Sequence, residues 1–229
     1  MLTSIRSNKS YTLPLAHRKN IARLDLSPRG NLLLTVDEDG HAILTNFRRR
    51  IVIYHLSFRG PIDALRFSPS GQHFAVGVGR RLQLWQTPSV PGTEAGGELE
   101  FAPFVLHREL AGHFDSIQNI EWSSDSRFIL TASKDLTARI WSLDPEDGFE
   151  PTTLAGHRQG VKAAYFSDNQ EAVRGTLGSD LECMLTDIDL HHEPRWRALS
   201  MGICHKEDRR SARERSPMAN SEKGFLHAE

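Results

Sequence analysis

The sequence predicts an all-β fold built from a repeated unit of four short antiparallel strands. Apolar residues alternate over runs of about five residues, as they do in strands with one buried face. Turns rich in Gly, Pro, Asp and Ser separate these runs, and the whole pattern returns along the chain. The clearest copy extends from Gly112 to Trp141, opens with a Gly-His pair and closes with Trp.

The composition excludes several classes of protein. The chain has 229 residues, with 28 Lys and Arg against 29 Asp and Glu and a formal net charge of −1, so no overall basic field favours nucleic acid. It has no run of about 18 apolar residues that would span a membrane, and its first residues lack the apolar core of a signal peptide. Cys183 and Cys204 lie outside the repeats, which argues against a disulfide framework and favours an intracellular protein.

The first copy of the repeat covers residues 17–47. Its apolar runs predict strands at 21–26, 32–36 and 42–47, followed by a fourth strand at 51–56. The turn at 27–30 has Pro second and Gly fourth, which suits type I geometry. Within the first strand, the side chains expected in the core are those of Ile21, Leu24 and Leu26.

Three further copies follow, with Leu26, Phe67, Trp122 and Phe166 in matching positions that are 41, 55 and 44 residues apart. Residues 88–103, rich in Pro, Gly and Glu, account for the longest spacing as a surface loop. The predicted units are residues 17–58, 60–110, 112–155 and a partial one at 156–173. Residues 174–229 show no alternation and are charged in both signs, so we predict a disordered or non-native tail.

A period of 41–44 residues, four strands per unit, an opening Gly-His and a closing Trp form the WD40 pattern of β-propeller blades. The first two copies are degenerate, because Thr45 stands where Trp141 stands and the turn at 79–81 lacks its Asp. The expected fold is a WD40 β-propeller fragment with about three complete blades, part of a fourth and an irregular C-terminal tail.

A reader who searches for a catalytic triad finds four suggestive residues in the third copy: His113, Ser133, Asp135 and Trp141. The favoured interpretation is a hydrogen-bond network inside the blade, since buried polar groups must be paired. Ser133 has no glycine-flanked elbow that would present it as a nucleophile. We therefore predict no catalytic residues and no enzyme.

Other possible sites are weaker. The C-terminal Cys and His residues match no metal-binding spacing, and neither a metal site nor a cofactor site is expected; they are Cys183, His191, His192, Cys204 and His205. Gly77 and Gly79 lack the helix that a phosphate loop needs. Three basic runs are interpreted mainly as solvated surface, with contact to phosphates as the alternative; they are residues 17–19, 48–50 and 80–81.

Several stretches of the chain resemble the periodic tryptophan protein 2 family, whose members are WD40 proteins of the nucleolar small-subunit processome. The resemblance covers residues 8–173, and its most specific parts are VDEDGHAIL, FAPFVLHR and DSRFILTASKDL. It implies a non-catalytic scaffold in pre-rRNA processing and small ribosomal subunit biogenesis, located in the nucleolus. It also implies other WD40 proteins of the same subcomplex as partners and contact with pre-rRNA or small nucleolar RNA backbone, without cofactor, membrane or small-molecule substrate.

The family's members are longer, with two tandem propellers, a helical C-terminal region and strands upstream of the segment that matches residues 9–18. We therefore expect a chain truncated at both ends, with residues 174–229 read from another frame or an intron. A cytosolic WD40 signalling adaptor that binds peptides on the propeller face is the alternative function. A hydrolase that uses His113 and Ser133 is a third hypothesis.

Overall fold

The computed structural model describes residues 2–3, 10–13, 15–88, 104–146, 149–166, 172–177, 183–187 and 202–204, and all of their regular structure is β. Four four-stranded antiparallel sheets and one two-stranded sheet are formed. The strands are β1 (Leu2–Thr3), β2 (Ser10–Tyr11), β3 (Ile21–Leu26), β4 (Leu32–Asp37), β5 (His41–Asn46), β6 (Ile51–Ser57), β7 (Ile62–Phe67), β8 (His73–Val78), β9 (Arg81–Gln86), β10 (Val105–Ala111), β11 (Ile117–Trp122), β12 (Phe128–Ser133), β13 (Ala138–Ser142), β14 (Thr152–Leu154), β15 (Val161–Phe166), β16 (Ala172–Leu177), β17 (Cys183–Asp187) and β18 (Gly202–Cys204). Among these residues there is no helix with the length and apolar character needed to cross a membrane.

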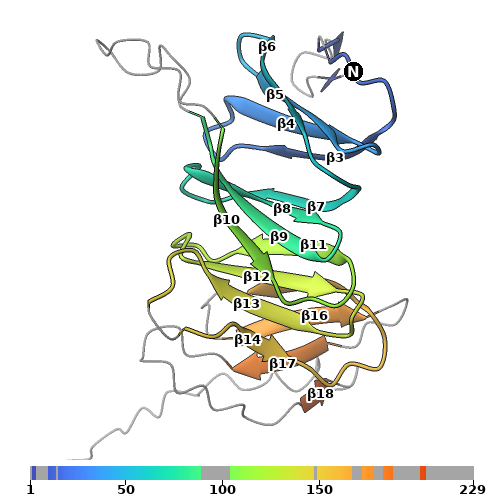
Figure 1. Ribbon diagram of the computed structural model, residues 1–229, viewed down its shortest axis with the longest axis vertical. Helices are drawn as coiled ribbons and strands as arrows, with labels where there is room; N and C mark the ends of the chain where they lie inside the picture. Colours follow the sequence, from blue (N-terminus) through green and yellow to red (C-terminus); the bar gives the residue numbers. More distant parts are fainter. Residues whose placement is uncertain are drawn as a thin grey trace, which may run out of the picture.

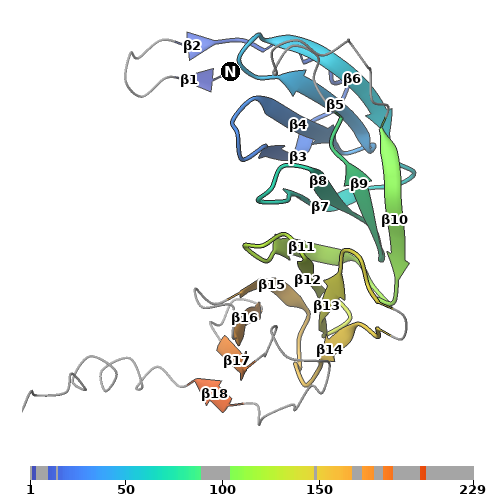
Figure 2. The ribbon, with the colours of Figure 1, turned by 90° about the vertical axis from the view of Figure 1, so that its left-hand side faces the viewer.

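The four sheets follow one another in chain order along the long axis of the molecule (Figure 1). Seen from the side, they form an open arc with β6 and β10 on its outer side (Figure 2). Each sheet contacts the next through its first strand, in the pairs β3–β7, β7–β11 and β11–β15. These stacked four-stranded sheets have the form of propeller blades, and the predicted all-β propeller fold is confirmed.

The turn between the first two strands has the same geometry in three sheets. The amide N–H of Gly30 donates to the carbonyl of Ser27 at 2.7 Å, and Gly71 and Ser126 repeat this bond at 2.9 Å to the serines three residues before them. All three of these residues have positive φ angles, from 63° to 73°. Glycine adopts this conformation without strain, which explains its use in two of the three turns.

The apolar core lies between successive sheets rather than within any one of them. The first cluster joins the first two sheets and includes Leu34 and Phe74. The second, with Ile117 and Trp122, joins the second and third sheets, and a third cluster joins the third and fourth. Each blade therefore depends on its neighbours for burial, as repeat architectures do.

Polar side chains also join the first strands of neighbouring sheets. The Asp25 carboxylate accepts the amide N–H of Phe67 at 2.6 Å, and the indole N–H of Trp122 donates to the carbonyl of Arg66 at 3.2 Å. The side-chain carbonyl of Asn119 accepts the amide of Ala164 at 3.3 Å. Backbone groups at the inner strand edges thus find partners across the gap between sheets.

The prediction that Ile21, Leu24 and Leu26 belong to the core is wrong, because these side chains are 43%, 62% and 42% exposed. The alternate residues Arg23 and Asp25 reach the second sheet, where the guanidinium of Arg23 donates to the carbonyl of Asp63 at 2.6 Å. Leu24 and Leu26 therefore face the opposite direction. Alternation located the strand correctly, but which face is buried depends on where the neighbouring sheet lies.

The expectation that no strand follows residue 173 is also wrong. Strand β16 pairs with β15, β17 pairs with β16, and β18 pairs with β17, so the fourth sheet has four strands. The last strand comes from residues 202–204, far along the chain from β17, so no regular turn spacing announces it. Outside the described residues lie the rest of the predicted tail, residues 167–171, and all of the predicted loop at 88–103 except residue 88.

Candidate interaction surfaces

A chain of buried polar side chains crosses the third sheet. The Nδ1 atom of His113 lies 2.8 Å from the carboxylate of Asp135, and its Nε2 atom lies 2.7 Å from the hydroxyl of Thr131. The indole N–H of Trp141 donates to the same hydroxyl at 2.9 Å. The predicted internal network therefore exists, but its hydroxyl belongs to Thr131, not to Ser133.

The protonation of this network follows from its geometry. Burial lowers the pKa of His113 and favours the neutral ring. A neutral ring with its proton on Nδ1 donates to Asp135 and accepts the Thr131 hydroxyl proton at Nε2. The Thr131 oxygen then accepts the indole N–H of Trp141, so each polar hydrogen has an acceptor. The network joins the segment before β11, which carries His113, to the turn between β12 and β13, which carries Asp135. Both nitrogen atoms of His113 are engaged, so the ring is not free to act as a base.

Ser133 is directed away from the histidine. Its hydroxyl donates to the carbonyl of Asp115 at 3.1 Å and accepts the amide N–H of Asp135 at 3.2 Å, and the side chain is fully buried. The hydrolase hypothesis needs a hydrogen bond between nucleophile and base, and Ser133 bonds only to backbone groups.

We expect Ser133→Ala to cost about 1 kcal/mol of unfolding free energy, the usual value of a side-chain hydrogen bond. Urea unfolding measures the loss. The folded wild-type protein should not react with a fluorophosphonate probe at this residue. Labelling of Ser133 that the Ala variant abolishes would restore the hydrolase hypothesis.

Asp135 is the acceptor at the centre of the third-sheet corner. Its carboxylate accepts the amide of Phe114 at 2.9 Å, the amide of Thr137 at 3.0 Å and the hydroxyl of Thr137 at 2.6 Å. Burial opposes ionisation of this carboxyl, but the hydrogen bonds from Thr137, Phe114 and His113 outweigh it and lower the pKa of Asp135 to about 2.

This shift predicts an acid-dependent stability. The pKa of Asp135 in the folded protein lies below the ordinary aspartate value of 3.8, so ionised Asp135 stabilises the fold above pH 4 and that contribution is lost as the pH falls toward 2. Asp135→Asn should cost roughly 2 kcal/mol at pH 7 and should flatten the stability profile between pH 4 and 2. Urea midpoints across this range test the prediction, with the exposed Asp115→Asn as control. Equal acid dependence in the Asp135 variant and the wild type would contradict it.

The first sheet contains a second network of this kind that the sequence analysis missed. His17 Nε2 lies 2.8 Å from the Thr35 hydroxyl, and His17 Nδ1 lies 3.3 Å from the Asp37 carboxylate. A constant offset of 96 residues relates His17 to His113 and Thr35 to Thr131. The two carboxylates do not follow this offset, because Asp37 lies at the position of Ser133 and the third-sheet carboxylate belongs to Asp135.

The first sheet, which lacks the Trp, also differs from the third sheet at the residue that precedes the opening His. A Cβ atom on Gly112 would lie 2.9 Å from the Trp141 ring in the third sheet. A guanidinium nitrogen of Arg139 would be closer still, at 2.7 Å. The first sheet has Ala16 at the position of Gly112 and the smaller Thr45 at the position of Trp141. The Thr45 hydroxyl is buried and has no hydrogen-bond partner among the described residues.

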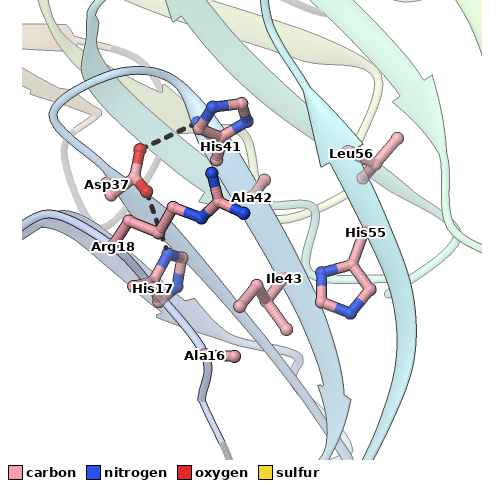
Figure 3. Close-up of a pocket in the computed structure, with 9 residues that line it drawn as sticks. All are labelled: Ala16, His17, Arg18, Asp37, His41, Ala42, Ile43, His55 and Leu56. Atoms are coloured by element: carbon pink, nitrogen blue, oxygen red, sulfur yellow. Dashed lines mark hydrogen bonds and ion pairs between the residues drawn. The ribbon is translucent and has the colours of Figure 1, made fainter.

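A pocket of about 370 Å³ lies at the first-sheet network, with His17 and Asp37 in its lining (Figure 3). Asp37 is already engaged there, since it accepts the amides of Asp39 and His41 as well as the contact from His17. The polar groups left to a ligand are the guanidinium of Arg18 and the imidazoles of His41 and His55, which would suit an acidic group. The lining residues are Ala16, His17, Arg18, Asp37, His41, Ala42, Ile43, His55 and Leu56.

The other predicted basic runs are exposed and lie in a turn or at the start of a strand, since Arg81 opens β9. Residues 48–50 form the connection between β5 and β6. In the run at 80–81, Arg81 pairs with Glu109 at 2.7 Å, which removes one cation from the patch. Cys183 and Cys204 are register partners on β17 and β18. The described part of the chain contains no group of three or more metal-binding side chains, and His191, His192 and His205 lie outside it.

Comparison with known proteins gives matches over most of this chain. The sequence profile of the family described as "WD domain, G-beta repeat" matches residues 104–142. The "Periodic tryptophan protein 2 homolog" of Neurospora crassa is 64% identical over 166 residues, which cover 72% of this chain and 18% of that protein. "Periodic tryptophan protein 2" of Saccharomyces cerevisiae is 51% identical over 168 residues (73% and 18%), and the Mus musculus homolog is 34% identical over 165 (72% and 17%). The aligned part of the chain thus spans about a fifth of the length of these relatives.

Proposed function

For a WD40-repeat chain that is homologous to part of periodic tryptophan protein 2, we propose a role as a non-catalytic scaffold in ribosome biogenesis. The observation that carries the proposal is the 64% identity to the Neurospora crassa relative over 166 residues. The site of action is the nucleolus, and the assembly is the small-subunit processome that matures small-subunit rRNA. Other WD40 proteins of that assembly are the partners.

The physical properties of the chain support a scaffold rather than an enzyme. The polar side chains of the third sheet, among them His113 and Asp135, form hydrogen bonds to one another that stabilise the blade corner. The arc of sheets presents many short turns to its surroundings, which suits simultaneous contact with several proteins. With a net charge of −1, any contact with RNA backbone is local, through turns such as residues 48–50.

Depletion of the intact protein is the test. The small-subunit rRNA should fall while large-subunit rRNA is comparatively spared, and a tagged full-length copy should concentrate in the nucleolus. The tagged copy should also co-purify with other WD40 processome proteins in moderate salt. A cytosolic location together with unchanged rRNA maturation would overturn the scaffold role and favour the signalling adaptor.

A further inference from the structure

One corner position repeats in all four sheets and changes its chemistry in the third. The residue that follows the opening His, or Phe58 in the second sheet, is exposed in every case. Three sheets place arginine there and the third places phenylalanine; the four residues are Arg18, Arg59, Phe114 and Arg158. The Phe114 side chain is 82% exposed, the highest value among the large exposed hydrophobic residues described. The fold therefore does not need an aromatic ring at this position.

A second apolar side chain stands at the same corner against the preference of the backbone. Leu136 has a φ of 68° and is 41% exposed, whereas the equivalent residue of the first sheet is Gly40, with a φ of 84°. The left-handed conformation favours glycine and is unfavourable for leucine. Leu136 thus combines backbone strain with an apolar side chain in water, and folding rewards neither property. Strained, exposed positions of this kind concentrate at functional sites.

Phe114 and Leu136, which we call the apolar corner, project from one fixed support. The amide of Phe114 donates to the Asp135 carboxylate at 2.9 Å, and Leu136 directly follows Asp135. The amide of Lys134 donates to the carbonyl of Ser116 at 3.0 Å, which ties the two connections together. Binding through the corner would therefore require little ordering of the backbone.

Positive charge borders the apolar corner. Lys134 and Arg158 are exposed, and neither forms an ion pair with any described residue. The turn that contains Lys134 lies beside the segment that contains Arg158, since a Cβ on Gly160 would be 3.2 Å from the Cα of Lys134. Asp115, the exposed acid that follows Phe114 in the sequence, accepts the amide N–H of Ser116 at 2.6 Å.

We propose that the apolar corner docks into an apolar pocket of a partner protein, and that acidic side chains around this pocket face Lys134 and Arg158. An exposed ring protrudes from the surface, so only a concave partner can remove it from water. Aromatic anchors in such pockets carry much of the affinity of an interface. The proposal does not depend on the role in ribosome biogenesis.

A protein pocket fits the corner better than single-stranded RNA does. RNA would stack a base on Phe114 and place phosphates on the cations. Leu136 offers no flat surface on which a second base could stack. An aliphatic and an aromatic side chain together match the lining of an apolar pocket.

The test places the photo-crosslinking residue p-benzoylphenylalanine at position 114 of the tagged full chain in fungal cells. A matched chain carries it at position 59, the equivalent place on the second sheet. Crosslinked peptides from the purified assembly are identified by mass spectrometry. Position 114 should crosslink one protein at least ten times more strongly than position 59 does, at an apolar pocket bordered by Asp or Glu.

The double substitution Phe114→Arg and Leu136→Gly is the second arm, and it installs the residues that the fold itself uses in the first sheet. Because it removes the left-handed leucine, its thermal midpoint should equal or exceed that of the wild type. It should nevertheless lower recovery of the crosslinked partner at least tenfold, and Lys134→Glu should lower it several-fold.

Four results would overturn the proposal: a ribonuclease-sensitive crosslink to RNA, equal crosslinking from both positions, no crosslink at all, or full recovery of the partner by the double variant. A partner that is unrelated to ribosome assembly would support the docking site and count against the proposed function. The two proposals are thus separable.

Discussion

Replacing Trp141 with Ala is expected to lower the free energy of unfolding by about 3–5 kcal/mol. The indole is 3% exposed and packs in the cluster between the second and third sheets, so its loss leaves a cavity where the sheets meet. The substitution also removes the N–H donor to Thr131. Guanidinium unfolding followed by far-UV circular dichroism measures the change.

Trp141→Phe is the matched control because it keeps most of the ring and loses the N–H group. Its cost should be about 1–2 kcal/mol, the size of one buried hydrogen bond plus a small packing defect. The difference between the variants then isolates the cavity. A loss below about 1 kcal/mol for Trp141→Ala would show that the third sheet does not depend on this contact.

The second large effect is expected at Gly40, where the first sheet meets the connection to the second. A Cβ on this residue would lie 2.5 Å from the carbonyl oxygen of Gly60 and 2.9 Å from that of Phe58. Both are backbone atoms, so the connection itself would have to move, and the φ of 84° disfavours alanine in addition. Gly40→Ala should cost roughly 3–4 kcal/mol.

Gly30→Ala separates the two causes. Gly30 has a φ of 64° and no atom within 4 Å of a Cβ, so it retains the conformational cost without the clash. Its loss should be about 1–2 kcal/mol, and both values come from urea midpoints. Equal losses at Gly30 and Gly40 would show that the connection relaxes freely.

Much of the fold could be predicted because its causes are local. Alternating apolar residues and turns such as 27–30 fix strands and hairpins within a few residues, and the period of the repeat then fixes the blades. The face of Leu24 could not be predicted, since it depends on a sheet that does or does not lie opposite. Strand β18 could not be predicted either, because it joins β17 from a distant part of the chain.

The networks divide in the same way. The Gly-His opening and the closing Trp141 announced the third-sheet network, and only its hydroxyl was assigned to the wrong residue. The first-sheet network was hidden because its carboxylate, on Asp37, comes two residues early, although the histidine keeps the same geometry toward Thr35. In the first sheet a carboxylate from a different position contacts the histidine, and a comparison position by position does not detect this.

The exchange of Gly112 and Trp141 for Ala16 and Thr45 bears on how such repeats diverge. In the arrangement of the third sheet, a tryptophan at position 45 would meet the methyl group of an alanine at position 16, so Thr45→Trp should be tolerated only after Ala16→Gly has made room. The two positions form an epistatic pair, and a double-mutant cycle across them should be non-additive. Divergence of this blade then proceeds by compensated steps, and a repeat that has lost its signature letters can retain its full architecture.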